Sequence, residues 1–238
     1  MAVKTILLKL SGEALIGSRE YGIDTDTLDY LSNEILEVRN KFNDLRIALV
    51  VGGGNIWRGA DYEKLGMDRS VADSAGMLAT MINGLALQDA LEKMKIPVRT
   101  LSSLANPSVA ELFIRRRALR HLDKNRVIIL VGGSGQPYMT TDITVFPLAL
   151  EISADLLLMS KNDVDGIYDS DPKLNPKAKR IKRITHIDAL SRQIKALDST
   201  ALSMCMDNKM PISVFNIFIN GTLSGILEGK KLGTLISD

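Results

Sequence analysis

The stretch RIALVVGGGNIWRG (46–59) joins an unbroken apolar run to three consecutive glycines. A short, continuous apolar run of this kind predicts a strand of a parallel sheet that is buried on both faces. Glycine carries no Cβ, so the backbone N–H groups of such a turn can approach an anion closely. Because Arg58 follows four residues after the last glycine, we expect this strand to end at a site for an anionic ligand.

Similar apolar runs recur along the chain and alternate with helical patterns. Strands are expected at 3–10, 97–101, 126–131, 154–159, 211–216 and 233–237, and helices at about 25–42, 70–93 and 187–208. The first helix shows Leu28, Leu31, Ile35 and Val38 at steps of three and four, as one apolar face should. This alternation predicts an α/β fold, a three-layer αβα sandwich around a mostly parallel sheet. We expect residues 1–238 to form a single domain.

The expected helix at 70–93 carries an apolar face that has two interpretations. Val71, Ala75, Leu78, Ile82 and Ala86 recur on that face, and Met77 and Met81 stand beside it. The simpler interpretation is that the face packs into the core. The alternative is a partly buried subunit interface, because methionine side chains pack adaptably.

Composition excludes several classes of function. The chain has 30 Lys and Arg against 28 Asp and Glu, so no strong field favours nucleic acid or a membrane surface as a partner. We expect neither a membrane span nor a signal peptide. The single Cys205 excludes an internal disulfide and fits the reducing cytoplasm. Together with His121 and His186 it leaves too few ligands for a structural zinc site, and we expect no protein-bound metal.

Glycine turns follow three of the expected strands: KLSGEAL (9–15), GGGN (52–55) and GGSGQP (132–137). In parallel sheets, ligands bind at the carboxyl ends of the strands, where these turns would meet. The run GGGNIWRG lacks the spacing of a dinucleotide-binding fingerprint, and GEALIGSR (12–19) lacks the lysine of a P-loop. Each turn by itself could be a tight loop, but three at one sheet edge predict a site for two phosphate groups.

Lys9 stands in an otherwise apolar strand, ILLKLS (6–11). Burying a cation there is costly unless it faces a ligand or a carboxylate, so we expect Lys9 to act in the site. Asp142 and Asp198 are candidate partners, although each also precedes a helical pattern and could be a helix N-cap. Cations, backbone donors and carboxylates are the groups that phosphoryl transfer requires.

Residues 161–184 interrupt the alternation of strands and helices. This segment contains two prolines, several Asp and Asn residues and a basic end. It predicts a long surface loop or short hairpin, which could be a nucleotide lid or simply a solvated loop.

Seven segments carry a resemblance to the bacterial uridylate kinases of the amino acid kinase superfamily. They are LLKLSGEAL (7–15), VVGGGNIWRG (50–59), GMLATMINGLALQDAL (76–91), GGSGQPYMTTD (132–142), DVDGIYDSDP (163–172), KALDSTALSMCMDNKMPISVFN (195–216) and GTLIS (233–237). They occur in order through nearly the whole chain. The resemblance implies transfer of phosphate from ATP, with Mg²⁺, directly to UMP, and a cytoplasmic homohexamer under allosteric control.

The resemblance also implies a role for individual residues. Catalysis would involve Lys9, Arg58, Asp142 and Asp198. ATP would contact Lys9, Leu10, Ser11, Gly12, Gly54, Arg58, Asn162, Tyr168 and Asp171. UMP would contact Gly53, Asp73, Ser134, Gly135, Gln136, Pro137, Tyr138, Met139, Thr140 and Thr141. Because SKNDVDG (160–166) is one residue longer than in some relatives, Lys161 could replace Asn162 as the ATP contact.

Two other functions stay open on the sequence. The chain could phosphorylate a small carboxylate or carbamate, as other members of the superfamily do. It could also be a nucleotide-binding protein without catalysis, although Lys9, Arg58, Asp142 and Asp198 are all present. Sequence spacing decides neither the regulatory ligand nor the choice between UMP and CMP.

Overall fold

The computed structural model describes residues 3–194 and 197–238. Within them, nine strands form one sheet in the order β4-β3-β5-β2-β1-β6-β8-β9-β7. All neighbouring pairs are parallel except β8 and β9. The strands are β1 Thr5–Leu10, β2 Arg46–Val51, β3 Val98–Ser102, β4 Glu111–Leu112, β5 Val127–Val131, β6 Leu156–Ser160, β7 Arg183–Ile184, β8 Ile212–Phe215 and β9 Thr234–Ile236. The predicted mostly parallel sheet is confirmed, and only the two-residue strands β4 and β7 were not predicted.

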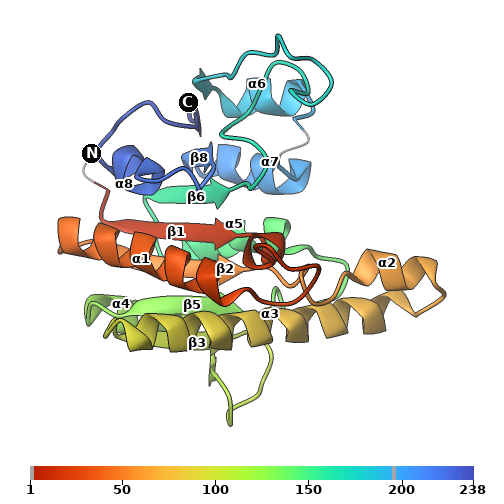
Figure 1. Ribbon diagram of the computed structural model, residues 1–238, viewed down its shortest axis with the longest axis vertical. Helices are drawn as coiled ribbons and strands as arrows, with labels where there is room; N and C mark the ends of the chain where they lie inside the picture. Colours follow the sequence, from red (N-terminus) through yellow and green to blue (C-terminus); the bar gives the residue numbers. More distant parts are fainter. Residues whose placement is uncertain (1–2, 195–196) are drawn as a thin grey trace.

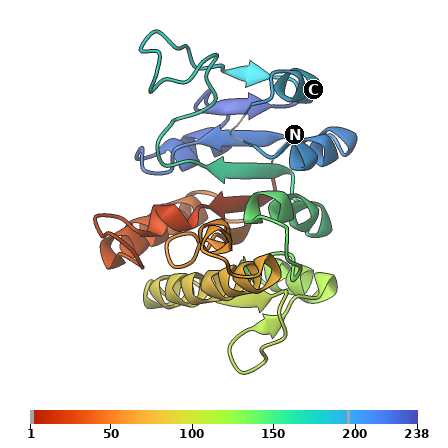
Figure 2. The same cartoon turned by 90° about the vertical axis from the view of Figure 1, so that its right-hand side faces the viewer.

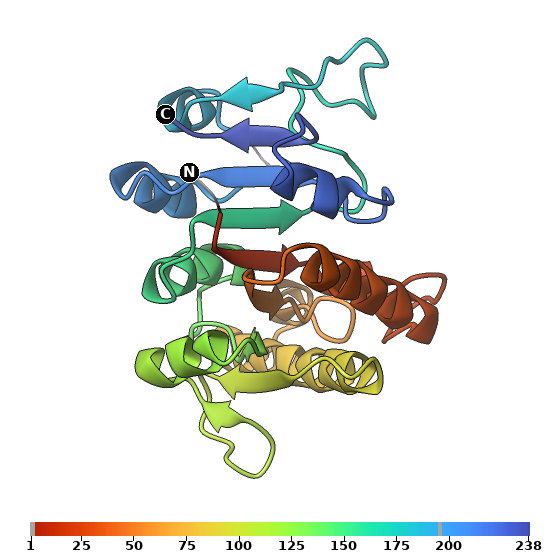
Figure 3. The ribbon, with the colours of Figure 1, turned by 90° about the vertical axis from the view of Figure 1, so that its left-hand side faces the viewer.

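Helices cover both faces of the sheet, which confirms the predicted three layers (Figures 1 and 3). One face packs against α1 (Thr25–Lys41), α3 (Arg69–Lys93) and α8 (Thr222–Leu227). The other face packs against α4 (Arg115–Asp123), α5 (Thr141–Glu151), α6 (His186–Ser191) and α7 (Ser199–Asp207). On each face, an apolar cluster fills the space between the sheet and the helices that cover it. That residues 1–238 fold as a single domain stays a prediction.

The register of the central strands brings the glycine turns to one level. Lys9 in β1 pairs with Val50 in β2 and with Met159 in β6. The strands therefore end together, and the turns after them, including the one-turn 3₁₀ helix η1 (Gly12–Leu15), lie at the same sheet edge. In Figure 1 the arrowheads of β1 and β6 point to this edge, where α2 (Gly59–Lys64) also lies.

The polar segment after β6 is a long excursion at the end of the molecule farthest from β3 (Figure 2). An isolated antiparallel bridge joins Tyr168 to Arg180, and β7 closes the segment at the sheet edge. This arrangement agrees with the predicted loop or short hairpin. The helical pattern predicted at 187–208 forms two helices, α6 and α7; Lys195 and Ala196 between them lie outside the described residues.

Helix α3 corrects one sequence interpretation. Val71, Leu78 and Ile82 are 57%, 53% and 51% exposed, so the prediction that their face packs into the core is wrong. The buried face consists instead of Met77, Met81, Leu87 and Leu91 together with small or polar residues, namely Ala72, Ala79, Thr80, Asn83, Gly84 and Ala90. Small side chains let the helix approach β5 closely: a Cβ on Gly84 would come within 2.4 Å of Val131 Cγ1. This close approach therefore depends on a glycine, which an apolar pattern ignores.

None of the helices in the described part of the chain combines the length and the hydropathy that a bilayer crossing requires.

Candidate active site

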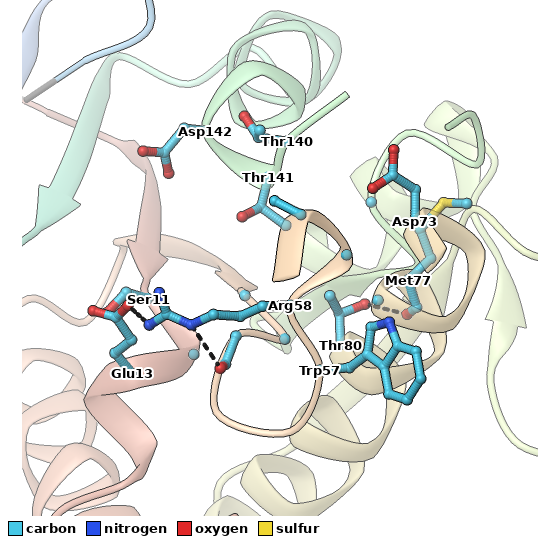
Figure 4. Close-up of a pocket in the computed structure, with 18 of the residues that line it drawn as sticks. Ser11, Glu13, Trp57, Arg58, Asp73, Met77, Thr80, Thr140, Thr141 and Asp142 are labelled. Atoms are coloured by element: carbon cyan, nitrogen blue, oxygen red, sulfur yellow. Dashed lines mark hydrogen bonds and ion pairs between the residues drawn. The ribbon is translucent and has the colours of Figure 1, made fainter. Parts of the chain in front are cut away.

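A cavity of about 680 Å³ opens at the carboxyl edge of the sheet, between the turns that follow β1, β2, β5 and β6. Figure 4 shows how its side chains converge: Thr141 and Asp142 from α5, Ser11 and Glu13 from the first turn, and Asp73 from α3. The lining residues are Lys9, Ser11, Gly12, Glu13, Gly52, Gly53, Gly54, Trp57, Arg58, Gly59, Ala60, Asp61, Arg69, Asp73, Gly76, Met77, Thr80, Gly133, Met139, Thr140, Thr141, Asp142, Lys161, Asn162, Asp163 and Val164.

Two lysines share one carboxylate at the floor of this cavity. Lys9 Nζ lies 2.5 Å from Asp142 Oδ1, and Lys161 Nζ lies 3.5 Å from Asp142 Oδ2. Lys9 is 5% exposed, so its charge is buried but paired, as the sequence predicted. The cluster contains two cations and one anion, so its excess positive charge favours binding of a further anion.

Local folding places Asp142 in this cluster. Thr140 is the N-cap of α5 and accepts a hydrogen bond from the N–H of Ile143 at 3.3 Å, which leaves Asp142 in the first turn of the helix. The N-cap interpretation is therefore wrong for Asp142. Burial opposes ionisation of Asp142, but Lys9 and Lys161 outweigh it and hold the pKa of its carboxyl below the usual range. Burial, with Lys9 nearby, lowers the pKa of Lys161 although Asp142 partly offsets the effect.

The first two glycine turns touch through their backbones. A Cβ on Gly12 would lie 2.5 Å from the N atom of Gly54, and one on Gly52 would lie 2.8 Å from the N atom of Gly12. A Cβ on Gly53 would lie 2.8 Å from the carbonyl oxygen of Gly76 in α3. Only glycine allows this approach, and the result is a wall of bare backbone along the cavity.

Arg58 lies across the open side of the glycine wall. Its Nε donates to the carbonyl oxygen of Gly54 at 3.3 Å, and its guanidinium forms an ion pair with Glu13 (Figure 4). Both partners of this pair are about half exposed, so the pair adds little stability and can be exchanged for a ligand.

Asp73 marks the far end of the cavity. Its Oδ2 accepts hydrogen bonds from Arg69 Nε at 2.7 Å and from the N–H of Tyr138 at 2.8 Å. Tyr138 has a φ of 65° and its ring lies under the Arg69 guanidinium, with 5.7 Å from Cζ to the ring centroid. The contact ties α3 to the segment after β5, and it places one carboxylate where a sugar hydroxyl could bind.

The structure brings most of the predicted site residues together. Lys9, Ser11, Gly12, Gly53, Gly54, Arg58 and Asp73 line the cavity, and so do Met139, Thr140, Thr141, Asp142 and Asn162. Lys161 lines it as well, so both candidates for that ATP contact are present.

Several predicted residues do not line the cavity. Ser134, Gly135, Gln136, Pro137 and Tyr138 form the turn beside it, where Ser134 Oγ accepts from the N–H of Gln136. Leu10 is buried in the core and can contribute only its backbone. Tyr168 and Asp171 lie in the long polar segment; the Tyr168 hydroxyl donates to Asp165 Oδ1 at 2.6 Å.

Asp198 is also outside the lining residues. Its Oδ1 accepts hydrogen bonds from the N–H groups of Thr200 and Ala201, at 2.9 and 3.2 Å, and so caps α7. The N-cap interpretation is therefore correct for Asp198. Because α5 and α7 both run back from the carboxyl edge of the sheet and pack together, the α7 cap lies on the same edge as the cavity.

Sequence reasoning missed other lining residues. Trp57 stacks on Tyr62 with 3.6 Å between ring centroids, and its Nε1 donates to the carbonyl oxygen of Ala72 at 2.9 Å. Thr80 accepts from the N–H of Gly132 at 2.8 Å and so joins α3 to the third glycine turn. Among these residues, only Thr80 carried a sequence signal for a place in the site, because it is a polar side chain on a helix face. Glu13 gave none, because its pairing with Arg58 is a tertiary contact.

Comparisons with known proteins extend this geometry. Residues 4–216 match the profile of the amino acid kinase family. The chain is 49% identical over 233 residues to a uridylate kinase of Deinococcus radiodurans, covering 98% of this chain and 94% of that protein.

Solved structures agree with the sequence relatives. A crystal structure of UMP kinase from Bacillus anthracis superposes with a TM-score of 0.96 at 38% identity, covering 100% of this chain and 97% of that one. A UMP kinase from Ureaplasma parvum gives 0.92 at 37% identity, with full coverage of both chains. A uridylate kinase from Archaeoglobus fulgidus, at 22% identity and a TM-score of 0.71, supports the fold alone.

The cavity, the glycine turns and the paired lysines therefore occur in a chain whose sequence and fold agree with the same set of relatives. This chain belongs to the amino acid kinase family.

Proposed function

We propose that this chain is a UMP kinase, which transfers the γ-phosphoryl group of ATP to UMP and forms ADP and UDP. One observation carries the proposal. Lys9, buried and paired with Asp142, lies where two glycine turns meet, in a chain that is 49% identical to a protein named uridylate kinase. A cation and bare backbone at one point are what a transferred phosphoryl group requires.

The proposed reaction needs no general base. A phosphate monoester such as UMP has its second pKa near ~6, so its oxygen is mostly ready to attack at neutral pH. Neither His121 nor His186 is among the lining residues. Transfer is then direct and in line, without a covalent enzyme intermediate. The chain contributes alignment and neutralisation of charge by Lys9, Arg58 and backbone N–H groups.

We assign the two nucleotides to opposite ends of the cavity. The phosphates of ATP lie against Ser11, Gly12 and Gly54, with Lys161 or Asn162 beside them. The remainder of ATP lies toward the segment that holds Tyr168 and Asp171. This segment follows β6 directly and therefore leaves the sheet at the edge where the cavity opens, which supports the assignment.

UMP takes the other end. Its phosphate faces Gly53 and its ribose faces Asp73, while its base contacts the segment 134–141. The carboxylate of Asp73 at that end of the cavity supports the assignment. Asp198 acts indirectly, because its carboxylate caps α7 at the same sheet edge.

The residues present fit a Mg²⁺ ion that arrives with ATP. Among the described residues, no group of three or more His, Cys, Asp or Glu side chains gathers to hold a metal. Asp142 already pairs with two lysines. Mg²⁺ in kinases is commonly bound through substrate phosphates and one or two carboxylates. When bound, the ion would neutralise phosphate charge, and Asp142 orients Lys9 and Lys161 toward the same phosphates.

We propose further that the protein is a cytoplasmic homohexamer. The exposed apolar side chains of Val71, Leu78 and Ile82 support self-association, since they form a stripe on α3 that the described chain leaves uncovered. The single cysteine supports a reducing compartment.

The acceptor can be identified by measuring ADP release from ATP with a panel of acceptors. The purified chain is supplied in parallel with UMP, CMP, acetylglutamate, aspartate and carbamate. UMP should give the largest kcat/KM. A larger value with a carboxylate or carbamate would replace the proposal with another kinase of the family, and ATP binding without ADP release from any acceptor would indicate a protein without catalysis.

A further inference from the structure

Asn83 is a polar side chain in the middle of the long helix α3, and its exposed fraction is 0%. Burying a carboxamide costs free energy unless its donors and acceptor are all satisfied. Asn83 is not among the residues that line the cavity. Its presence in the packed layer between α3 and the sheet therefore requires a reason other than direct contact with a ligand.

The partners of Asn83 give that reason. Its Nδ2 donates to the carbonyl oxygen of Gly52 at 2.6 Å and to Asn55 Oδ1 at 2.6 Å. Asn55 is 4% exposed and returns a hydrogen bond from its Nδ2 to Asn83 Oδ1 at 2.9 Å. The Nδ2 of Asn55 also donates to the carbonyl oxygen of Gly22 at 2.8 Å. Every polar atom of the two side chains is thus paired in one buried network.

This network holds both ends of the glycine turn after β2. At the first end, Asn83 binds the carbonyl oxygen of Gly52, and the N–H of Gly52 donates to the carbonyl oxygen of Leu10 in β1 at 3.0 Å. At the other end, Asn55 follows directly after Gly54. Within the described chain, the N–H groups of Gly53, Gly54 and Asn55 donate no hydrogen bond to the protein. Gly53 and Gly54 line the cavity. Consecutive free N–H groups of this kind form an anion-binding concavity.

We propose that Asn83 is a positioning residue for phosphoryl transfer. Acting through the Gly52 carbonyl and the Asn55 side chain, it sets the peptides of Gly53 and Gly54 so that their N–H groups meet the phosphoryl group in transit. The inference rests on the proposed function. On the cavity side, the described chain contacts the turn through Arg58, whose Nε donates to the Gly54 carbonyl oxygen and not to an N–H group; on the buried side Asn55, Asn83 and the backbone of Gly12 set its geometry.

The kinetic consequence is distinct from a loss of stability. A misplacement of about 1 Å can cost on the order of a hundredfold in rate when catalysis depends on alignment. An interaction made mainly in the transition state lowers kcat and kcat/KM together and leaves KM nearly unchanged. A residue needed only for folding would instead lower the melting temperature without changing the kcat of the folded fraction.

The test compares Asn83→Leu with the unaltered chain and with Leu87→Ala. Leucine has the same number and branching of side-chain heavy atoms as asparagine but makes no hydrogen bond. Leu87 lies one turn further along α3 and is fully buried, but it belongs to the apolar cluster and its side chain makes no hydrogen bond to the network. We expect Asn83→Leu to lower kcat at least about tenfold, with the KM values for UMP and ATP within about threefold, while Leu87→Ala lowers the melting temperature but retains kcat.

A double variant sharpens the comparison. If Asn55 and Asn83 act through one network, Asn55→Ala with Asn83→Leu should lose little more kcat than the more affected single variant. A folded Asn83→Leu protein with kcat within twofold of the unaltered chain would overturn the inference, and so would fully additive losses in the double variant. Lack of UDP formation by the unaltered chain in the same assay would instead refute the proposed function.

Discussion

At the scale of single residues, the site depends on one carboxylate between two lysines. Lys9 is buried in β1, and Asp142 holds it at 2.5 Å while also facing Lys161 at 3.5 Å. A buried ammonium group without a partner costs free energy. Asp142 therefore supplies the counter-charge of Lys9 and fixes its orientation, although the carboxylate itself need not touch the transferred group.

Asp142→Asn should lower kcat about a hundredfold or more, because Lys9 loses its counter-charge and its orientation. The purified variant should remain folded with a lower melting temperature. Asp89→Asn, which breaks an exposed ion pair with Lys93, is the matched control and should leave kcat unchanged. Near-normal turnover in folded Asp142→Asn would refute the assigned role.

The same variant has a defined pH dependence. The folded-state pKa of Asp142 is lowered, so its ionisation stabilises the fold above the ordinary carboxyl pKa near ~4. This contribution disappears as the pH falls through the folded-state value. The difference in melting temperature between the unaltered chain and Asp142→Asn should therefore be constant near neutral pH and shrink below pH ~4. A difference that grew on acidification would contradict the sign.

Lys161→Met should not destabilise the protein. Burial and the charge of Lys9 lower the pKa of Lys161, so its charged form costs free energy in the folded state at neutral pH. Methionine removes that cost and keeps an apolar stem. We expect an unchanged or higher melting temperature together with a higher KM for ATP. Lys230→Met, at an exposed ion pair with Glu228 whose partners do not line the cavity, should change neither. A marked fall in melting temperature for Lys161→Met would contradict this account.

Sequence reasoning identified Lys9 because a cation in an apolar strand is conspicuous. It did not separate Asp142 from Asp198, since both precede helices and both could be caps. The deciding fact is which residue the helix uses as its N-cap: Thr140 caps α5 and leaves Asp142 for Lys9, whereas Asp198 caps α7 itself. That choice depends on side-chain geometry, which spacing does not reveal.

At the scale of elements, the glycine turn after β2 packs against two other segments. It packs on η1 through Gly12 and on α3 through Gly76 and Ala79. Glycine therefore serves two purposes here: it exposes N–H groups toward the cavity, and it lets α3 lie close behind the turn.

The two purposes can be separated at neighbouring positions. A Cβ at Gly53 would lie 2.8 Å from the Gly76 carbonyl oxygen and 2.9 Å from Ala79 Cβ, whereas one at Gly54 meets only the Arg58 side chain at 3.7 Å. Overpacking of this kind costs roughly 1–3 kcal/mol. Gly53→Ala should therefore lower the melting temperature by several degrees, and Gly54→Ala should not. Equal melting temperatures for the two variants would show that α3 does not restrict the turn.

The sequence predicted the glycine turns and the length of α3, but not which face of α3 is buried. The apolar stripe suggested the core, while the structure buries the small or polar residues Ala72, Ala79, Asn83 and Gly84 beside Met77, Met81, Leu87 and Leu91. Close packing selects small side chains, which carry a weak hydropathy signal. The buried Asn83 carried no sequence signal beyond its polarity, because its partners, Asn55 and the Gly52 carbonyl, are about 30 residues away in the chain.

At the scale of the whole molecule, one twisted sheet carries all the site segments on a single edge, and α3 presents its uncovered apolar stripe to the outside. If the proposed hexamer uses this stripe, Leu78→Asp should lower the molecular mass measured by light scattering after size-exclusion chromatography. Leu174→Asp, at another exposed leucine, should leave the mass unchanged. A hexameric Leu78→Asp protein would place the subunit contacts elsewhere, and a monomeric unaltered chain would refute the assembly.

Phosphorus NMR of the unaltered chain incubated with ATP, Mg²⁺ and UMP tests most directly whether the chain transfers phosphate to UMP. UDP and ADP should appear in equal amounts, and omission of UMP should abolish ADP formation. ADP formation that does not depend on UMP, or the absence of UDP while both nucleotides are bound, would contradict the assignment of this chain as a UMP kinase.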